Sequence, residues 1–203
     1  MCQFIETIRM VDGVVMNLPY HQQRVNRTLD SLGVVNCNLN LKDIFDSQEF
    51  QIPAGIVKAR MVYDRFGIHD LSLAPYEQRS IRSFKLVSCN SIEYAYKSTD
   101  RSQLNYLREE RGNADEIIIV KDGLLTDTSF SNIALFDGNR WVTPQSPLLN
   151  GTMRQFLLKN ETIFEKSILV DDVLSYQKLA LINAMLPLGA CEITIDATNL
   201  LFE

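Results

Sequence analysis

The 203-residue chain has only two histidines and four cysteines, the residues that supply most protein ligands for transition metals. His21 and His69 alone argue against a histidine-based metal centre. The cysteines are scattered and contain no Cys-x-x-Cys pair, which argues against a zinc site and against a disulfide framework. They are Cys2, Cys37, Cys89 and Cys191. We therefore expect four reduced thiols and no bound metal.

Long apolar runs and a surplus of basic residues are also lacking. No run reaches the roughly 18 apolar residues of a membrane span, and no basic region followed by an apolar stretch opens the chain. The net charge of −5 comes from interspersed acids and bases, without a basic footprint for nucleic acid. We expect a cytoplasmic protein that binds neither membranes nor nucleic acid. Its 46% hydrophobic and 22% charged residues are typical of globular proteins.

The first part of the chain predicts strands interrupted by one or two helices. Val11-Asp12-Gly13 indicates a hairpin turn. Val25, Leu29 and Leu32 recur at helical spacing, and Gly33 is suited to end that helix. The expected elements are strands over residues 3–10 and 14–18, helices over 19–32 and 41–50, and strands over 55–63 and 68–75.

A polar stretch, Glu77–Ser83, is the best candidate for a junction between two domains. Hairpins mixed with helices on both sides of it predict an α+β fold with two lobes, residues 1–82 and 83–203. The elements expected after the junction are strands over 84–89, 116–120, 124–126, 132–136, 141–143, 178–185 and 192–197, and helices over 102–111, 152–160 and 171–177.

Two side chains could take part in pyridoxal phosphate chemistry. Lys97 lies between an expected strand and an expected helix. Most lysines are solvated, but this chemistry needs an amine on a short segment, first as a Schiff base and then as proton carrier. Asp127, in Thr126-Asp127-Thr128-Ser129, is by itself typical of a turn or a helix cap. Alternatively, its carboxylate could keep a pyridine nitrogen protonated.

A third segment, Asn150-Gly151-Thr152-Met153-Arg154, precedes an expected helix. Asn-Gly is a common turn, and Thr152 could be an ordinary N-cap. A glycine directly before a helix also leaves backbone amides available to a phosphate. Arg24 would add a positive partner, although taken singly it also fits a solvent-facing arginine.

Together these segments resemble the class IV aminotransferases, the fold-type IV pyridoxal phosphate enzymes, over nearly the whole chain. Five motifs follow in the family's order, and they are Phe4-Ile5-Glu6-Thr7-Ile8-Arg9, His21-Gln22-Gln23-Arg24, Lys97–Arg101, Thr126–Ile133 and Asn150–Phe156. The resemblance implies a two-lobed, D-amino acid aminotransferase-like fold, a homodimer, and pyridoxal 5'-phosphate as the cofactor. It implies Lys97 as the Schiff-base lysine, carried by the second lobe. The implied cofactor-binding residues are Arg24, Asp127, Ser131, Asn132, Gly151, Thr152 and Met153.

The chain departs from the family pattern in two places. Asp127 stands where the family usually has glutamate, so the ring or strand must shift by roughly an ångström, or a water must bridge the gap. The chain also starts almost at the Phe4–Arg9 motif, so we expect a truncated N-terminal lobe.

The branch that the motifs resemble most is 4-amino-4-deoxychorismate lyase. Thr7 and the Asn150–Arg154 segment are nearer to the lyase pattern than to that of the transaminases. The resemblance implies that Lys97 abstracts a proton from a small amino substrate, with release of pyruvate and of 4-aminobenzoate for folate biosynthesis. A D-amino acid or branched-chain transaminase is the alternative, because both use the same cofactor machinery. A shortened, non-catalytic family member is a third.

The groups that bind the substrate carboxylates are not identified by any motif. Lys58, Arg60 and Arg101 are candidates by charge alone, and each also fits a surface or structural role. Tyr94 and Tyr96 could line the cofactor ring or simply pack.

Overall fold

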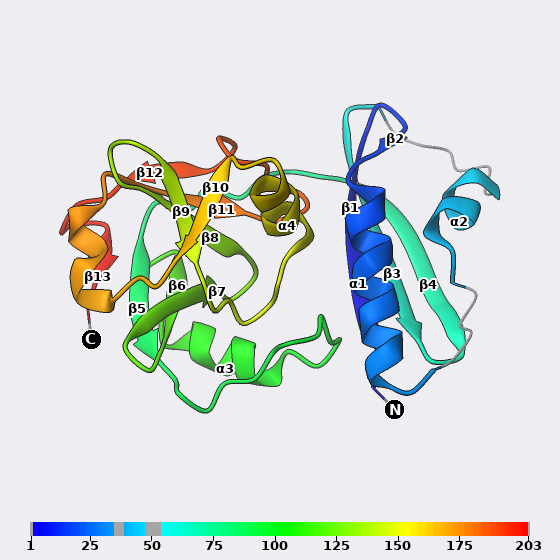
Figure 1. The fold of residues 1–203 in the computed structure, drawn as a ribbon, viewed down its shortest axis with the longest axis horizontal. Helices are drawn as coiled ribbons and strands as arrows, with labels where there is room; N and C mark the ends of the chain where they lie inside the picture. The colour runs from blue at the N-terminus through cyan, green and yellow to red at the C-terminus, as the bar shows by residue number, and fades with distance from the viewer. Residues whose placement is uncertain (1, 35–38, 48–53, 203) are drawn as a thin grey trace. The chain divides into compact units, whose positions relative to one another are not determined.

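The computed structural model describes residues 2–34, 39–47 and 54–202, and the chain divides into two compact units (Figure 1). Unit 1 consists of residues 1–78 and 96–100, and unit 2 of residues 79–95 and 101–203. The chain therefore first enters unit 2 at Arg79, within the polar stretch Glu77–Ser83. Cys37 and the end of the helix expected over 41–50 lie outside the described residues.

In its described residues, unit 1 is an antiparallel sheet with strand order β2-β1-β3-β4 and two helices. Its elements are β1 (Phe4–Val11), β2 (Val14–Val15), α1 (Leu18–Ser31), α2 (Leu41–Ser47), β3 (Ile56–Asp64) and β4 (Gly67–Pro75). Asp12 and Gly13 both have positive φ, 47° and 85°, which suits the tight turn between β1 and β2. β2 is shorter than expected because Asn17 takes a left-handed conformation and α1 begins at Leu18, with Pro19 in its first turn.

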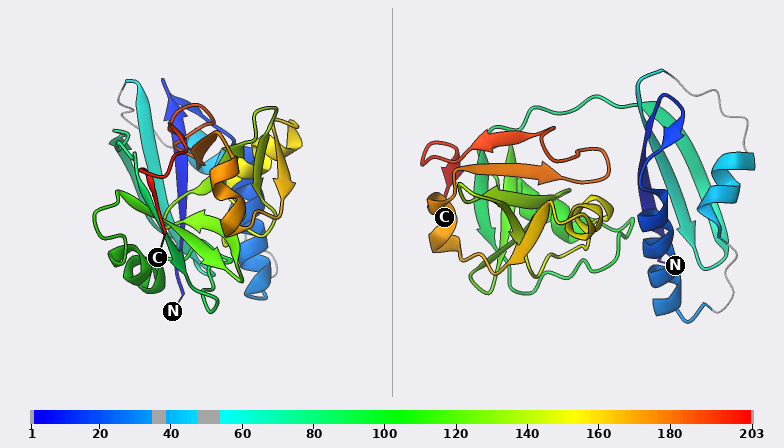
Figure 2. Two further views of the ribbon diagram at one scale, coloured as in Figure 1. Left: turned by 90° about the vertical axis from the view of Figure 1, so that its left-hand side faces the viewer. Right: turned by 45° about the horizontal axis from the view of Figure 1, so that its top comes forward.

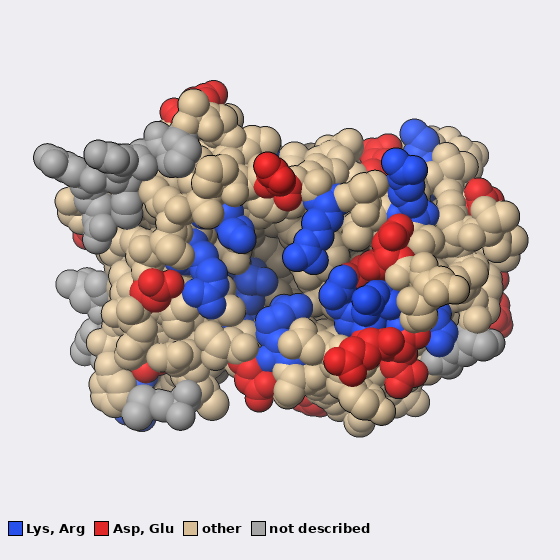
Figure 3. Space-filling model, turned by 180° about the vertical axis from the view of Figure 1, so that it is seen from behind, with Lys and Arg blue, Asp and Glu red and all other residues tan. Residues whose placement is uncertain are grey.

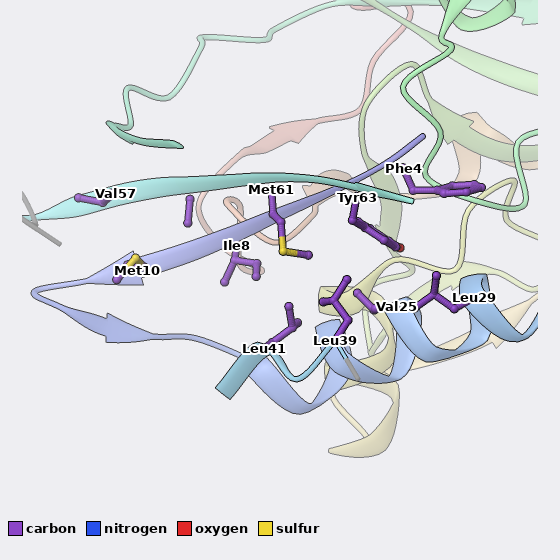
Figure 4. Close-up of a cluster of buried hydrophobic side chains, with 11 residues drawn as sticks. Phe4, Ile8, Met10, Val25, Leu29, Leu39, Leu41, Val57, Met61 and Tyr63 are labelled. Carbon is purple, nitrogen blue, oxygen red and sulfur yellow. The ribbon is translucent and has the colours of Figure 1, made fainter. Parts of the chain in front are cut away.

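The core of unit 1 lies between the sheet and α1 (Figure 4). Alternate residues of β1 are buried, as a strand with one covered face requires. Val25 and Leu29 of α1 pack in the same cluster, at the helical spacing seen in the sequence. The strand residues of the cluster are Phe4, Ile8, Met10, Val57, Ala59, Met61 and Tyr63.

The lysine segment belongs to unit 1, whereas the resemblance implied the second lobe. Ile5 N donates to Lys97 O at 2.8 Å, and Thr99 N donates to Gln3 O at 2.9 Å. Phe4 and Ser98 form an antiparallel bridge between these bonds. Backbone pairing with β1, more than ninety residues away in sequence, attaches this loop to the first sheet.

Unit 2 is built on a nine-stranded sheet with a main path of β10-β9-β8-β7-β6-β5-β13. β11 pairs with β8 and with β12. Figure 2 shows the strong curvature of these strands, with α3 outside them. The elements are β5 (Phe84–Ser88), α3 (Ser102–Glu109), β6 (Glu116–Lys121), β7 (Leu124–Thr128), β8 (Asn132–Phe136), β9 (Trp141–Pro144), α4 (Thr152–Lys159), β10 (Ile163–Lys166), the 3₁₀ helix η1 (Val170–Ser175), β11 (Lys178–Ile182), β12 (Glu192–Thr194) and β13 (Leu200–Leu201).

Two short strands of unit 2 have no counterpart in the sequence predictions. β10 pairs in parallel with β9, and β13 pairs in parallel with β5. Both are set by long-range pairing and not by a local apolar alternation. The segment expected as a helix over 171–177 is instead η1, and β11 ends at Ile182, earlier than expected. No helix in the described ranges is long and apolar enough to cross a membrane.

Candidate functional site

Lys97 is half-buried and held at the edge of the unit 1 sheet by its own backbone. Thr99 Oγ1 donates to Gln3 O at 3.2 Å, next to the bond from the Thr99 amide. The Tyr96 ring meets Phe4 edge-on, at 6.4 Å between centroids. Tyr96 therefore packs against the start of β1, and the loop around the lysine has a defined backbone position.

Unit 1 also contains a buried charged network centred on Glu6. Arg24 Nε donates to Glu6 Oε1 at 2.8 Å, and Arg24 Nη2 donates to Glu6 Oε2 at 2.6 Å. His21 Nδ1 lies 2.5 Å from Glu6 Oε2 and acts as its donor. Glu6 is 0% exposed and Arg24 is 4% exposed. His21 and Arg24 reach the same carboxylate because they lie three residues apart on α1.

Charges within this network set the protonation of its members. Burial raises the pKa of Glu6, but Arg24 and the hydrogen bonds from His21 and Arg24 outweigh it and lower that pKa to about 2. Burial lowers the pKa of His21, against the opposing effect of Glu6, and the charges of Arg24 and Lys97 lower it further. Lys97 is therefore within electrostatic range of the network that contains Arg24.

In unit 2, Asp127 lies at the centre of a second buried network, made of neutral donors. Asn132 Nδ2 donates to Asp127 Oδ1 at 2.8 Å and to Leu149 O at 2.8 Å. Leu149 N donates to Asp127 Oδ2 at 2.9 Å. β7 and β8 place the two side chains together, because Asp127 and Asn132 are paired across these strands. Asn132 thus connects the carboxylate to the loop that precedes α4.

The carboxylate of Asp127 has no ion-pair partner among the described residues. It is 5% exposed, and this burial raises its pKa to about 6, although the Leu149 amide and Asn132 act in the opposite direction. The nearby Arg154 contributes only at longer range. Its guanidinium donates to Pro144 O at 2.9 Å and to Glu165 Oε1 at 2.6 Å.

Gly151 lies at the N-cap of α4, and because it has no side chain it leaves room for the amide group of Asn132. A Cβ at position 151 would lie 2.1 Å from Asn132 Oδ1. Gly151 has an ordinary φ of −66°, so space and not backbone conformation requires glycine there. Among the described residues, no side-chain hydrogen bond caps α4 from its N-cap residue Gly151, and the first amides of an α-helix have no acceptor within the helix. Thr152 and Met153 are buried in this first turn.

Two other candidate residues are engaged with backbone. The Ser131 hydroxyl lies 2.8 Å from Asn132 O and 3.1 Å from Ile182 O, so it ties β8 to β11. Arg101 Nη2 donates to Ser129 O at 2.7 Å, and its guanidinium lies 6.0 Å from the centre of the Tyr94 ring. Arg101 and Tyr94 thus have structural contacts within unit 2.

Unit 2 also has a cavity of about 310 Å³, lined in part by Tyr94, Lys121, Leu124, Thr126 and Leu148. No predicted cofactor-binding residue lines it. Within the described ranges, no three or more His, Cys, Asp or Glu side chains are grouped so that they could hold a metal ion.

Glu6 and Leu149 are not among the site residues predicted from the sequence. A signal for Glu6 was present, because it has the same strand parity as the buried Phe4 and Ile8 and so predicts a buried acid that needs a cation. Leu149 contributes only its backbone amide, which carries no sequence signal. The structure places Lys97 and Arg24 in unit 1, and it brings Asp127, Asn132 and Gly151 together in unit 2.

These residues fit pyridoxal phosphate by their chemistry. A buried carboxylate without a cation suits a protonated pyridine nitrogen, since an unpaired buried charge is costly. The uncapped start of α4 suits a phosphate group. The half-buried Lys97 suits the aldehyde of the cofactor, and the buried Arg24 supplies a positive charge near this lysine.

Comparisons with known proteins agree with this chemistry. The family model for amino-transferase class IV matches residues 3–192. A Haemophilus influenzae protein of unassigned function is 32% identical over 187 residues, which cover 91% of this chain and 98% of that protein. A solved structure of a candidate 4-amino-4-deoxychorismate lyase from Haemophilus somnus has a TM-score of 0.87 and 34% identity, covering 93% of this chain and 98% of that one.

A hypothetical aminotransferase from Mycobacterium tuberculosis, solved in its PLP-bound form, has the same fold at 16% identity. Its TM-score is 0.75, and the match covers 99% of this chain and 84% of that one. The expected fold of the fold-type IV pyridoxal phosphate enzymes is confirmed by these comparisons. The chain belongs to the class IV aminotransferase family.

Proposed function

We propose that the protein is a pyridoxal phosphate-dependent lyase that acts on 4-amino-4-deoxychorismate and releases pyruvate and 4-aminobenzoate. The observation that carries the cofactor is the carboxylate of Asp127, which is buried, accepts hydrogen bonds from neutral donors and has no ion-pair partner among the described residues. A buried carboxylate without a positive partner is energetically unfavourable, so we expect a ligand to supply that partner.

The proposal gives each predicted residue a separate task. Lys97 Nζ would hold the aldehyde end of the cofactor, and Arg24, whose guanidinium is fixed by two hydrogen bonds to Glu6, would supply a positive charge for the phosphate. The amides at the start of α4, at Thr152 and Met153, would also hold the phosphate, as the resemblance implies. Asp127 accepts a hydrogen bond from the ring nitrogen. The resemblance assigns residues of both units to one cofactor, and variants in each unit test that assignment.

When bound, pyridoxal phosphate supplies an electron sink for the substrate carbon that loses a proton. Lys97 Nζ would accept this proton, because the amine of a lysine is a suitable general base for a proton on the substrate carbon. Asp127 would accept a hydrogen bond from the protonated ring nitrogen. Its side chain, which is shorter than the family's usual glutamate, is fixed by the hydrogen bond from Asn132. Cleavage of the carbon–oxygen bond to the enolpyruvyl group would then make the ring aromatic, and the released enolate would take up the proton from Lys97 to become pyruvate.

The lyase reaction is favoured over transamination by two observations. Thr7 and the Asn150–Arg154 segment resemble the lyase branch. The solved structure with 34% identity comes from a candidate lyase of this kind. A class IV transaminase for D-amino or branched-chain amino acids is the alternative, and it differs in needing an oxo acid as second substrate. A shortened, non-catalytic family member is the remaining alternative.

The first experiment asks whether Lys97 binds the cofactor covalently. Purified protein loaded with pyridoxal phosphate should absorb in the visible or near-ultraviolet region. Reduction with borohydride should bleach this band and leave the cofactor's mass on the peptide that contains Lys97. Lys97→Arg keeps the positive charge but should abolish the mass label, whereas Lys42→Arg, an exposed lysine on α2, should keep it. A wild-type protein without label would contradict the proposal.

The second experiment separates the reactions. Loaded protein should release 4-aminobenzoate from aminodeoxychorismate without an added oxo acid. Turnover of an amino acid that requires an oxo acid, with no 4-aminobenzoate released, would instead assign a transaminase.

We also propose that the protein forms a homodimer, as the resemblance implies for this family. Sedimentation of the loaded protein should then give about twice the monomer mass of 23.2 kDa.

A further inference from the structure

One face of the unit 1 sheet carries a row of basic side chains. Across β1 and β3, Arg9 is paired with Lys58 and Thr7 with Arg60. Residues directly opposite on antiparallel strands point to the same face, with their Cβ atoms about 5 Å apart. Their neighbours Ile8, Ala59 and Met61 belong to the core cluster with α1. Arg9, Lys58 and Arg60 therefore lie on the face opposite α1, and we call these three residues the basic row.

Acidic side chains near the basic row do not balance its charge. Arg60 Nη1 lies 3.4 Å from Asp70 Oδ2, and both side chains are well exposed, at 40% and 53%. Asp64, further along β3, is held by His69 and by the amide of Phe66. Figure 3 looks from the side opposite to that of Figure 1, and several Lys and Arg side chains gather on the unit 1 part of this face.

Neither Arg9 nor Lys58 forms an ion pair with any residue in the described ranges. The Nε of Arg9 is buried and has no hydrogen-bond partner among the described residues. A buried N–H without an acceptor loses its hydration and gains nothing in return. Like charges directly opposite each other on a sheet are also destabilising. Two unfavourable features thus coincide at one pair, Arg9 and Lys58.

We propose that the basic row binds the carboxylate groups of a small anionic ligand. This inference rests on the proposed function for the identity of the ligand, which would be a substrate of that site. The planar guanidinium groups of Arg9 and Arg60 suit carboxylates, because the N–H donors of a guanidinium match the two oxygens. Lys58 lies next to both arginines in the register and adds a third positive charge.

The charge count favours a ligand with more than one carboxylate. Asp70 compensates one cation of the basic row at most, which leaves two for the ligand. A single carboxylate would neutralise only one of those two. A dicarboxylate would satisfy both.

A purely structural role and a ligand-binding role predict opposite effects on stability. If the basic row held the sheet together, its removal would lower the melting temperature of the protein. If it is kept for a ligand, removing Arg9 or Lys58 relieves like-charge repulsion and should raise that temperature by a few degrees. Natural binding sites commonly show this conflict between function and stability.

The test is calorimetric titration of the cofactor-loaded protein with succinate, a dicarboxylate that has no amine to react. Succinamide serves as its neutral counterpart. Wild-type protein should bind succinate at least tenfold more tightly than succinamide, and the difference should shrink as salt is raised. Arg9→Gln, Lys58→Gln and Arg60→Gln should each weaken succinate binding about tenfold. Arg27→Gln, an exposed arginine on α1, should change it less than twofold.

Melting temperatures of the same variants complete the test. The inference is supported if Arg9→Gln and Lys58→Gln bind succinate more weakly and melt no lower than wild type. It is overturned if the variants bind succinate as wild type does, or if wild type binds succinamide equally well. The same titration on protein without added cofactor keeps the two proposals distinct. A protein that cannot take up cofactor contradicts the proposed function, while succinate binding still decides the role of the basic row.

Discussion

Glu6 in unit 1 and Asp127 in unit 2 are both buried acids with opposite electrostatic surroundings. Glu6 is bonded by the charged Arg24 and by His21, and its pKa is lowered to about 2. Asp127 is bonded by the neutral Asn132 and by a backbone amide, and its pKa is raised to about 6. Burial raises the pKa in both cases, so the presence of a contacting cation decides the sign.

The comparison separates a charge that is neutralised inside the fold from one that is not. The Glu6 network lies within unit 1, and two hydrogen bonds to Glu6 fix the orientation of the Arg24 guanidinium. The Asp127 network fixes the carboxylate but leaves its charge uncompensated. Such a group is stabilised by a positively charged ligand, and this is the reason for assigning it to the cofactor ring.

The largest expected effect comes from breaking the neutralised network. Arg24→Met should lower the free energy of unfolding by about 3–5 kcal/mol, because Glu6 would remain buried without its cation. Urea unfolding at pH 7 measures this. Arg27→Met, on the exposed face of α1, is the matched control and should stay within about 0.5 kcal/mol. A loss below about 1 kcal/mol for Arg24→Met would show that Glu6 does not depend on the pair.

The second prediction concerns the pH dependence of stability due to Asp127. Its folded pKa of about 6 is above the ordinary 3.8, so the folded state binds more protons than the unfolded state between these values. Stability from this group is therefore present below about pH 4 and lost as pH rises to about 6. The difference between 3.8 and about 6 corresponds to about 3 kcal/mol.

Asp127→Asn isolates this contribution. Urea unfolding of cofactor-free protein between pH 4 and 7 should show that the stability of wild type relative to this variant falls by up to about 3 kcal/mol as pH rises. Asp122→Asn, an exposed turn residue, should keep the wild-type dependence. Loading with cofactor should reduce the dependence if the ring nitrogen pairs with Asp127. An identical pH profile for wild type and Asp127→Asn would remove the contrast with Glu6.

The smallest predicted effect comes from Gly151→Ala, which tests how the Asp127 network is held. The added methyl would displace Asn132 and should lower the free energy of unfolding by about 1–3 kcal/mol. In the double variant with Asn132→Ala, the cost of the methyl should largely disappear, giving a coupling energy of at least about 1 kcal/mol. Simple additivity would mean that the two residues do not share space.

Local patterns predicted most elements of the fold, because their signals act over a few residues. Alternation in β1 and the helical spacing of Val25 and Leu29 were sufficient for the sheet and helix of unit 1. β10 and β13 could not be predicted this way, since each exists only by pairing with a distant strand. The helix expected over 171–177 became a 3₁₀ helix, which shares much of the same local signal.

The candidate site, like the fold, could be predicted from the sequence only in part. The motifs pointed to Lys97, Arg24 and Asp127, and the structure shows that each occupies a half-buried or buried position with defined hydrogen bonds. The motifs could not show that Asn132 links Asp127 to Leu149, because a backbone amide has no sequence signature. They suggested Arg101 and Lys58 by charge on equal terms. Contacts separate them, since Arg101 is bonded to Ser129 O and Lys58 lies in the basic row.

The sequence by itself determined the family and the set of chemical groups, because ordered motifs record residue types and spacing. Only the tertiary structure decided which charges are compensated. Glu6 meets a cation through a helix that packs on its strand, Asp127 meets only neutral donors, and Arg9 meets Lys58 across two strands. The physical reason is that desolvation and Coulomb energy depend on distances between residues far apart in sequence, which folding alone establishes.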